Sequence, residues 1–269
     1  MDAAKGPSAW ARFWNAGHWW KAVVLAVVYF VLYQALSLAM VPFVSLAGEP
    51  GSASYVLIFF TVPILLGGLL LVAFGASVGW LRSLFARQSL GGRGWMWIAI
   101  VVVLLFNVLH LLSIDYGTAG IEYVLTWLLT GLFIGFAEEV LTRGYVVKIM
   151  REAGHREIAV ALVSAGTFAL LHAGNLLGGQ SLLATGIQLV YTFFFGILMY
   201  LAMRVTRTLL APVLLHASTD PSIFMHAQYP ADGAIGAVAN LGNFAVIIVG
   251  AVLVFFIRGR IAQGARSTS

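Results

Sequence analysis

Residues 55–78 read YVLIFFTVPILLGGLLLVAFGASV, an unbroken run without a single charged side chain. About 20 consecutive apolar residues in a helix are enough to cross the hydrocarbon core of a bilayer. The run therefore predicts a transmembrane helix. Four further runs of this kind predict spans at Ala22 to Val41, Trp95 to Ile114, Leu182 to Met203 and Ala234 to Ile257.

The composition of the whole chain also indicates a membrane protein. Of its 269 residues, 61% are hydrophobic and 9% are charged, whereas an average soluble domain has roughly 25% charged residues. With a mean hydropathy of +0.96, the chain has more apolar surface than a compact soluble body could bury. This excludes a soluble enzyme and a disordered tail. The absence of cysteine excludes disulfides, thiolate metal sites and cysteine nucleophiles.

Three more segments are apolar but are shorter or interrupted by polar residues. They run from Ile121 past Glu138 and Glu139, from Ile158 to about His172, and from Thr208 to about Asp220. With them, the sequence predicts an all-α polytopic membrane protein of about eight transmembrane helices. We divide the chain into three N-terminal helices (residues 1–120), a core of four helices (121–220), and a last helix with a cytoplasmic tail (221–269).

The 15 lysine and arginine residues predict the orientation of the helices. All of them fall on one side of the eight-span arrangement, or in a helix leading to it, whereas the opposite loops contain Glu49, Asp115, Glu122 and Asp232. By the positive-inside rule, both termini should be cytoplasmic, in a plasma or inner membrane. Membrane topology thus explains the excess of Lys and Arg over Asp and Glu, and we expect no nucleic-acid partner. The first apolar run is too long for a cleaved signal and should remain as an anchor.

The most informative residues are ionisable groups within the fourth span, which reads FAEEVLTR from Phe136 to Arg143. A Glu or Arg at the centre of a membrane helix costs roughly 2.5 to 3.5 kcal/mol. If these groups lie inside the membrane, we therefore expect them to have a function. Glu139 and Arg143 are four residues apart and can pair on one helix face, while Glu138 points about 100° away. The alternative is that the helix leaves the membrane at Ala137 and that these residues form a solvated end.

Two histidines in other late spans favour a shared buried site. The fifth span ends at His172, and the seventh contains His216. Counted from the cytoplasmic helix ends, Glu139, His172 and His216 lie about 18, 24 and 14 Å inward. Helix tilt can close this spread of about two turns. A lone histidine in an apolar helix is more often structural, but two histidines together with a Glu pair predict one polar site.

The late spans carry three motifs in a fixed order. They are Glu138-Glu139-x-x-x-Arg143, Phe168-x-x-x-His172 and His216-x-x-x-Asp220. Together these motifs resemble the signature of the CPBP intramembrane proteases, a family that includes type II CAAX prenyl endopeptidases and bacteriocin-processing or Abi-like proteins. The resemblance covers about residues 121–220. It implies an eight-helix membrane core with a buried, glutamate-dependent endopeptidase site.

The resemblance also implies roles for the residues of the first two motifs. Glu138 would be the general base that activates a water molecule, and His172 would help to hold that water. Glu139 and Arg143 would form a supporting pair, with Phe168 as a further supporting residue.

The third motif, His216-x-x-x-Asp220, has an Asp where an Asn could donate a hydrogen bond. In the family, the histidine and an Asn or Asp four residues on are assigned near the substrate carbonyl. Here the second residue is Asp220, whose ionised carboxylate cannot donate a hydrogen bond to an oxyanion. We expect Asp220 to orient His216 or to keep it charged, which leaves His216 as the main donor.

Other interpretations of the same residues stay open. The resemblance favours a mechanism without a cofactor, but His172, His216 and Glu138 would also suit a His₂Glu zinc site. The buried charges would equally suit a proton-coupled transporter or a non-proteolytic membrane scaffold that binds a partner helix. The partners we expect are the lipid bilayer and a peptide or membrane-protein substrate. A prenylated CAAX peptide and a leader peptide are both compatible with the sequence.

Reporter fusions test the predicted topology. A reporter fused after Ser269 should lie in the cytoplasm, and one inserted in the loop near Glu49 should lie on the opposite side. Reporters on the same side would contradict the eight-span arrangement.

Overall fold

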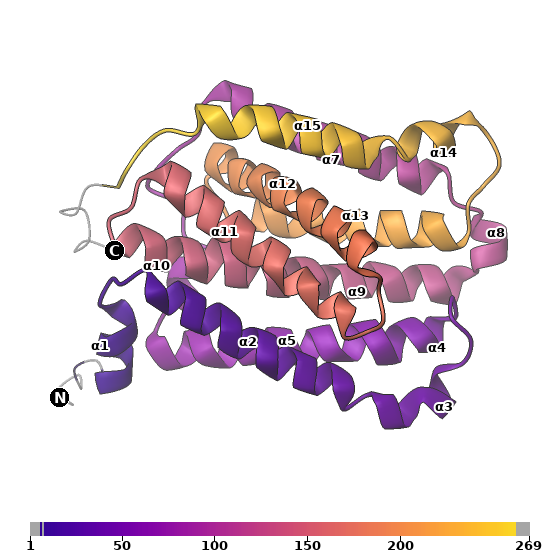
Figure 1. Ribbon diagram of the computed structural model, residues 1–269, viewed down its shortest axis with the longest axis horizontal. Helices are drawn as coiled ribbons and strands as arrows, with labels where there is room; N and C mark the ends of the chain where they lie inside the picture. The colour runs from indigo at the N-terminus through magenta and orange to yellow at the C-terminus, as the bar shows by residue number, and fades with distance from the viewer. Residues whose placement is uncertain (1–5, 7, 262–269) are drawn as a thin grey trace.

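The computed structural model describes residues 6 and 8–261. Within these residues the regular structure is helical, with no β-strand; two isolated bridges pair Ile114 with Pro230 and Arg156 with Arg260. The long helices run side by side along the longest axis of the molecule (Figure 1). The predicted all-α fold is confirmed. Residues 262–269, which end the predicted cytoplasmic tail, lie outside the described residues.

Seven helical segments of the described chain are long and apolar enough to cross a membrane. In chain order they are built from α2 (Trp20–Leu38); α4 (Ala53–Val56), η2 (Leu57–Thr61) and α5 (Val62–Val78); α7 (Trp97–Leu112); α9 (Ile121–Glu139), η4 (Val140–Val146) and α10 (Val147–Glu152); α11 (Glu157–Leu171); α12 (Leu182–Thr206); and α14 (Ala234–Ala239) with α15 (Gly242–Leu253). Shorter helices lie at helix ends and in loops. These are α1 (Ala9–Asn15), η1 (Val41–Phe43), α3 (Val44–Ala47), α6 (Leu81–Leu84), η3 (Gly94–Met96), α8 (Tyr116–Ala119), η5 (His172–Leu176) and η6 (Val254–Phe256).

The seventh predicted span, which is not among these seven segments, corresponds to α13 (Leu210–Gln228), a helix of the same length as α9 but more polar. We predicted that this span ends at about Asp220, whereas the helix continues for two more turns and includes Pro221. α13 packs against α9, α7 and α12 within the bundle (Figure 1). Helices on several sides shield its polar residues from lipid, which explains how so polar a helix lies in the bundle.

The fourth span does not end at Ala137. α9 continues into the π-helical stretch η4 and then into α10, so the helical segment ends only at Glu152. Glu139 and Arg143 lie within this segment and are 0% and 1% exposed. The alternative of a solvated helix end is therefore wrong. Short π-helical stretches inside α-helices are frequent at functional sites.

Two glycines bring α9 into close contact with α13. A Cβ atom on Gly131 would lie 2.3 Å from the carbonyl oxygen of Ala217, and one on Gly135 would lie 2.4 Å from that of Val213. Residues four apart share one helix face, so the two glycines form a smooth surface against the α13 backbone. Glu138 and Glu139 follow one turn later and are held beside α13.

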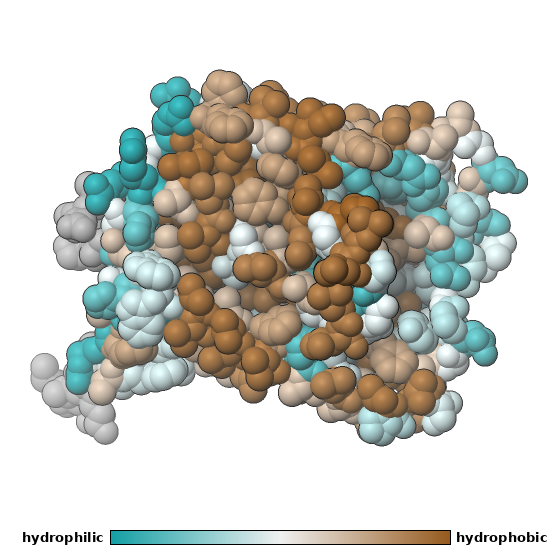
Figure 2. All heavy atoms as spheres, viewed as in Figure 1, coloured by the Kyte–Doolittle hydropathy of each residue, from teal (hydrophilic) through white to brown (hydrophobic). Residues whose placement is uncertain are grey.

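The surface of the bundle has an apolar middle and polar ends. Figure 2 shows hydrophobic residues over the central part of one face and hydrophilic residues gathered towards the two ends of the long axis. At the end near α1 (Figure 1), arginine side chains bind loop backbone: Arg204 donates to Gly91 O at 2.9 Å and Arg260 to Gly154 O at 2.7 Å. This distribution is typical of a bundle embedded in a bilayer. That this end faces the cytoplasm stays a prediction.

We expect Gly135→Ala to destabilise the protein, because the added Cβ would collide with the backbone of α13. Gly186→Ala is the matched control, since this helical position in α12 has no atom within 4 Å of an added Cβ. The control should be as stable as wild type or gain up to about 1 kcal/mol from helix propensity. Thermal unfolding in one detergent should lower the Tm for Gly135→Ala alone. Equal melting temperatures would show that α9 and α13 separate without cost.

Candidate active site

One buried carboxylate connects three of the predicted site residues. Glu139 Oε1 accepts a hydrogen bond from Arg143 Nη1 at 3.0 Å and lies 2.9 Å from Nδ1 of His216. Because Glu139 belongs to α9 and His216 to α13, this carboxylate joins the two helices. Its side chain is completely buried, and a buried charge without partners would be strongly destabilising. The predicted pairing of Glu139 with Arg143 is present.

The Arg143 guanidinium is surrounded by protein groups. Besides Glu139, it donates to Thr142 Oγ1 at 2.6 Å and to the carbonyl oxygen of Gly196 at 2.8 Å. Its Cζ lies 4.8 Å from the centroid of the Phe168 ring, a cation–π contact. A Cβ atom on Gly196 would come within 3.0 Å of Nη2, so the glycine leaves the room that the guanidinium occupies. These contacts make Arg143 a residue that fixes Glu139 in place.

His216 is fixed in orientation by its Nδ1 contact and by two aromatic rings. The ring centroids of Phe168 and Phe195 lie 5.5 and 5.0 Å from the imidazole centroid, both in edge-to-face geometry. The other ring nitrogen, Nε2, lies 3.7 Å from Glu138 Oε2 and 3.8 Å from Asp220 Oδ1. Both separations are too long for a direct hydrogen bond. The Nε2 side of the ring thus faces two carboxylates without being bonded to either.

Asp220, which we expected to orient His216 or to keep it charged, makes no hydrogen bond to the imidazole ring in this structure. The i,i+4 spacing on α13 places its carboxylate near Nε2, but the orienting bond comes from Glu139 on the neighbouring helix. The Asp220 side chain is 27% exposed and lies at the edge of the cluster. Its contribution in this structure is a negative charge beside the imidazole ring.

Glu138 and His172 line one cavity of about 100 Å³ that also borders α2. His172 Nδ1 lies 3.0 Å from the carbonyl oxygen of Phe168, one turn earlier. We therefore assign the proton to Nδ1, which leaves Nε2 as an acceptor. Glu138 Oε2 is buried and has no hydrogen-bond partner among the described residues. A water molecule occupies about 30 Å³ in the liquid, so the cavity has room for water beside these two groups.

α2 contributes residues to this cavity that we did not identify from the sequence. Tyr29, Tyr33 and Gln34 line it from α2, and Asn175 lines it from η5. In the sequence, the three α2 residues stand out from their neighbours only because their side chains are polar or partly polar within an apolar span. Which helix they face depends on tertiary packing, so the span pattern alone could not place them at the site.

The fit of a metal ion to this site can be tested on the arrangement of its ligands. Within residues 6 and 8–261, no three His, Cys, Asp or Glu side chains form a group that could hold a metal ion. Nδ1 of His172 is bonded to backbone and Nδ1 of His216 to Glu139. The alternative set of His172, His216 and Glu138 is thus not gathered as a metal site, and our mechanism uses no metal.

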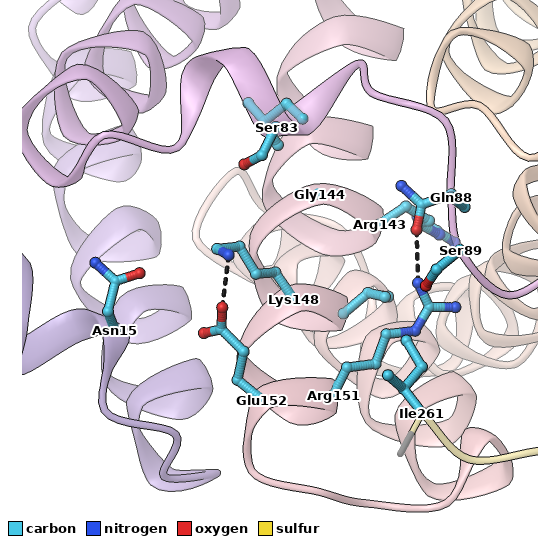
Figure 3. Close-up of a pocket in the computed structure, with 12 residues that line it drawn as sticks. Asn15, Ser83, Gln88, Ser89, Arg143, Gly144, Lys148, Arg151, Glu152 and Ile261 are labelled. Atoms are coloured by element: carbon cyan, nitrogen blue, oxygen red, sulfur yellow. Dashed lines mark hydrogen bonds and ion pairs between the residues drawn. The ribbon is translucent and has the colours of Figure 1, made fainter. Parts of the chain in front are cut away.

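A larger pocket of about 430 Å³ opens at the basic end of the bundle (Figure 3). Its charged residues already have partners: Lys148 pairs with Glu152 at 2.5 Å, and Arg151 donates to the two carboxylate oxygens of Glu157 at 2.9 and 2.8 Å. Arg143 lines this pocket too, but its charge is compensated within the buried cluster. The pocket has no histidine and no free acid in its lining, so it is not the candidate active site.

The segment that carries the buried cluster matches a known family. Residues 120–221 match the family described as type II CAAX prenyl endopeptidase Rce1-like. Over this segment the chain is similar to the Rce1-like family. The resemblance to CPBP intramembrane proteases is thereby confirmed, and the family is one of CAAX-protease-type intramembrane endopeptidases. Comparisons of the chain with curated proteins and with solved structures gave no match.

The Rce1-like match covers less than half of the chain. It contains every site residue that we predicted, from Glu138 to Asp220. It does not contain α2 or α5, although α2 forms one wall of the cavity at Glu138.

Two i,i+4 ion pairs in one helical segment provide a matched test of the buried cluster. Arg143→Ala leaves Glu139 buried without its cation and should cost about 3–5 kcal/mol of stability. Lys148→Ala breaks a pair with Glu152 whose side chains are 27% and 23% exposed, and should cost about 1 kcal/mol or less. Denaturant titration measures both losses. Two equally small losses would show that Glu139 does not need Arg143.

Proposed function

We propose that this protein hydrolyses a peptide bond within the membrane, using a water molecule that Glu138 activates. The observation that carries the proposal is the difference between two adjacent acids. Each acid has one buried oxygen without a hydrogen-bond partner, but Glu139 is bound through its other oxygen by Arg143 and His216, whereas Glu138 lines the same cavity as His172. General-base hydrolysis needs a carboxylate that is free to take a proton and a second group that holds the water.

The first step is attack of the water on the peptide carbonyl. Glu138 takes one proton from the water, while the water's other O–H group keeps its proton and donates a hydrogen bond to Nε2 of His172, whose Nδ1 is occupied by the backbone of Phe168. The water oxygen forms a bond to the carbonyl carbon. The electron pair of the carbonyl double bond moves to the carbonyl oxygen, which becomes an oxyanion.

His216 is the donor that we assign to this oxyanion. Carboxylates lie on both sides of its ring, at 2.9 Å from Nδ1 and at 3.7 and 3.8 Å from Nε2. This arrangement attracts a doubly protonated, positively charged ring. In that form Nδ1 donates to Glu139 and Nε2 donates to the oxyanion. In the second step the oxyanion re-forms the carbonyl double bond and the C–N bond breaks, while the amine nitrogen accepts from Glu138 the proton that came from the water.

The substrate we propose is a peptide that reaches the site from the bilayer. The family description names a CAAX prenyl endopeptidase. A prenyl chain partitions into the bilayer, because each buried CH₂ group contributes about 0.8 kcal/mol. It would therefore bring the attached peptide to the apolar surface of the bundle. An internally quenched farnesylated CAAX peptide is the appropriate probe.

Glu138→Gln keeps the size of the side chain and removes the base. Turnover of the farnesylated peptide by protein in nanodiscs should fall by about 10² or more, while the Tm stays close to that of wild type. His172→Ala should lose a similar factor, because the water loses its second partner. A Glu138→Gln variant that cleaves as fast as wild type would exclude Glu138 as the base and favour a scaffold or a transporter.

The same assay needs a control for metal chemistry. Our mechanism predicts that activity survives prolonged treatment with a chelator. Activity that is lost on chelation and restored by added zinc would instead assign His172, His216 and Glu138 to a metal site.

A further inference from the structure

Tyr29 on α2 has a buried hydroxyl group without a partner. The residue is 5% exposed, and its hydroxyl makes no hydrogen bond to any described residue. Leaving a buried polar group unsatisfied costs about 1–3 kcal/mol, and lipid offers no replacement. Other buried tyrosines of the bundle show the contrast: Tyr145 donates to Leu71 O at 2.8 Å, and Tyr200 donates to Glu157. Tyr29 thus has a donor that the fold does not use.

The Tyr29 hydroxyl group lies at the cavity of the proposed active site. Tyr29 lines the same cavity as Glu138 and His172. Among the described lining residues, the Tyr29 hydroxyl and Glu138 Oε2 are the two buried polar atoms without a hydrogen bond. The hydroxyl is seated against α5, where a Cβ atom on Gly67 would lie 2.8 Å from it. One unused donor and one unused acceptor are therefore built into a single cavity.

The cluster otherwise offers few donors to a substrate carbonyl. His216 supplies one N–H group through Nε2, in the mechanism proposed above. Asp220 lies 3.8 Å from that nitrogen, and an ionised carboxylate only accepts hydrogen bonds. A developing oxyanion is stabilised by donors aimed at it, and the loss of one costs about 10²–10³ in rate. A tyrosine hydroxyl is a suitable donor, and Tyr29 comes from a different helix than His216.

We propose that Tyr29 donates a hydrogen bond to the carbonyl oxygen of the scissile peptide bond, as a second donor beside His216. This inference rests on the proposed function. Tyr29 keeps its proton throughout, so it adds no proton transfer to the reaction, and its hydrogen bond strengthens as negative charge develops on the oxygen. Because Tyr29 lies outside residues 120–221, the proposal assigns a catalytic residue to a helix that the family match does not cover.

Tyr29→Phe removes the hydroxyl and keeps the ring, which stacks on Tyr33 with centroids 6.0 Å apart. With the farnesylated peptide, kcat should fall by about 10-fold to 10² while KM stays within about twofold, because the donor acts mainly in the transition state. Tyr229→Phe is the matched control. It removes a tyrosine hydroxyl that donates to Gly51 O at 3.1 Å, away from the cavity, and should leave kcat unchanged.

Position 220 provides a second, independent readout. An Asn at this position has an amide that donates, unlike Asp. Asp220→Asn removes the negative charge beside His216 but adds a donor. If Tyr29 supplies the donor that Asp220 lacks, the ratio of kcat after this substitution to kcat before it should be larger in the Tyr29→Phe background than in wild type. An equal factor in both backgrounds would show that the two positions act on different atoms, and would overturn the proposal.

The remaining outcomes are also decisive. A Tyr29→Phe variant with wild-type kcat, or with a change confined to KM, would overturn the role of Tyr29. If this variant does not fold, Gly67→Ala replaces it, because its added Cβ displaces the hydroxyl and should lower kcat; an unchanged kcat would again overturn the role.

The Glu138→Gln variant separates the two levels of failure. An active Glu138→Gln variant, or a wild-type protein that leaves the peptide uncleaved, would refute the proposed function and the role of Tyr29 with it. An inactive Glu138→Gln variant beside a fully active Tyr29→Phe variant would refute the role of Tyr29 alone.

Discussion

The organisation of this bundle depends on one buried carboxylate, that of Glu139. A charge at this depth is stable only with a cation and hydrogen bonds around it. Arg143 provides the cation from the same helix, and His216 provides a second contact from α13. His216 reaches Glu139 only if α9 and α13 pack backbone to backbone, which explains why the contact face of α9 carries Gly131 and Gly135. The glycine contact is thus a condition for the charged cluster.

Two adjacent acids can serve different purposes because a helix turns about 100° between them. Glu139 points to Arg143 and α13 and is bound by both through Oε1, so it acts as a fixed counter-charge. Glu138 points to the cavity and keeps an oxygen without a partner. In a low-dielectric interior a free carboxylate is costly, and the bound neighbour holds the helix that presents it. The contacts of Glu139 thereby offset the free-energy cost of burying Glu138.

The sequence predicted the features that depend on short-range pattern. Apolar length identified the membrane helices, and four-residue spacing identified the pairing of Glu139 with Arg143. The sequence did not predict the contacts between helices: spacing shows that Asp220 is near His216, but not that Glu139 comes closer from α9. α13 was predicted too short because its polar residues and Pro221 resemble the end of a span. Packing against three helices continues it beyond that point.

The cavity is lined both by residues of the segment that matches the family and by residues outside that segment. Glu138 and His172 belong to the matched segment, whereas Tyr33 and Gln34 of α2 lie outside it and line the same space. Residues such as these contact whatever fills the cavity without activating the water. Two proteins with the same Glu and His motifs but different first helices would then share a reaction and differ in the peptide they accept. In the proposed mechanism the motifs thus supply the chemistry, and α2 supplies side chains that line the cavity around it.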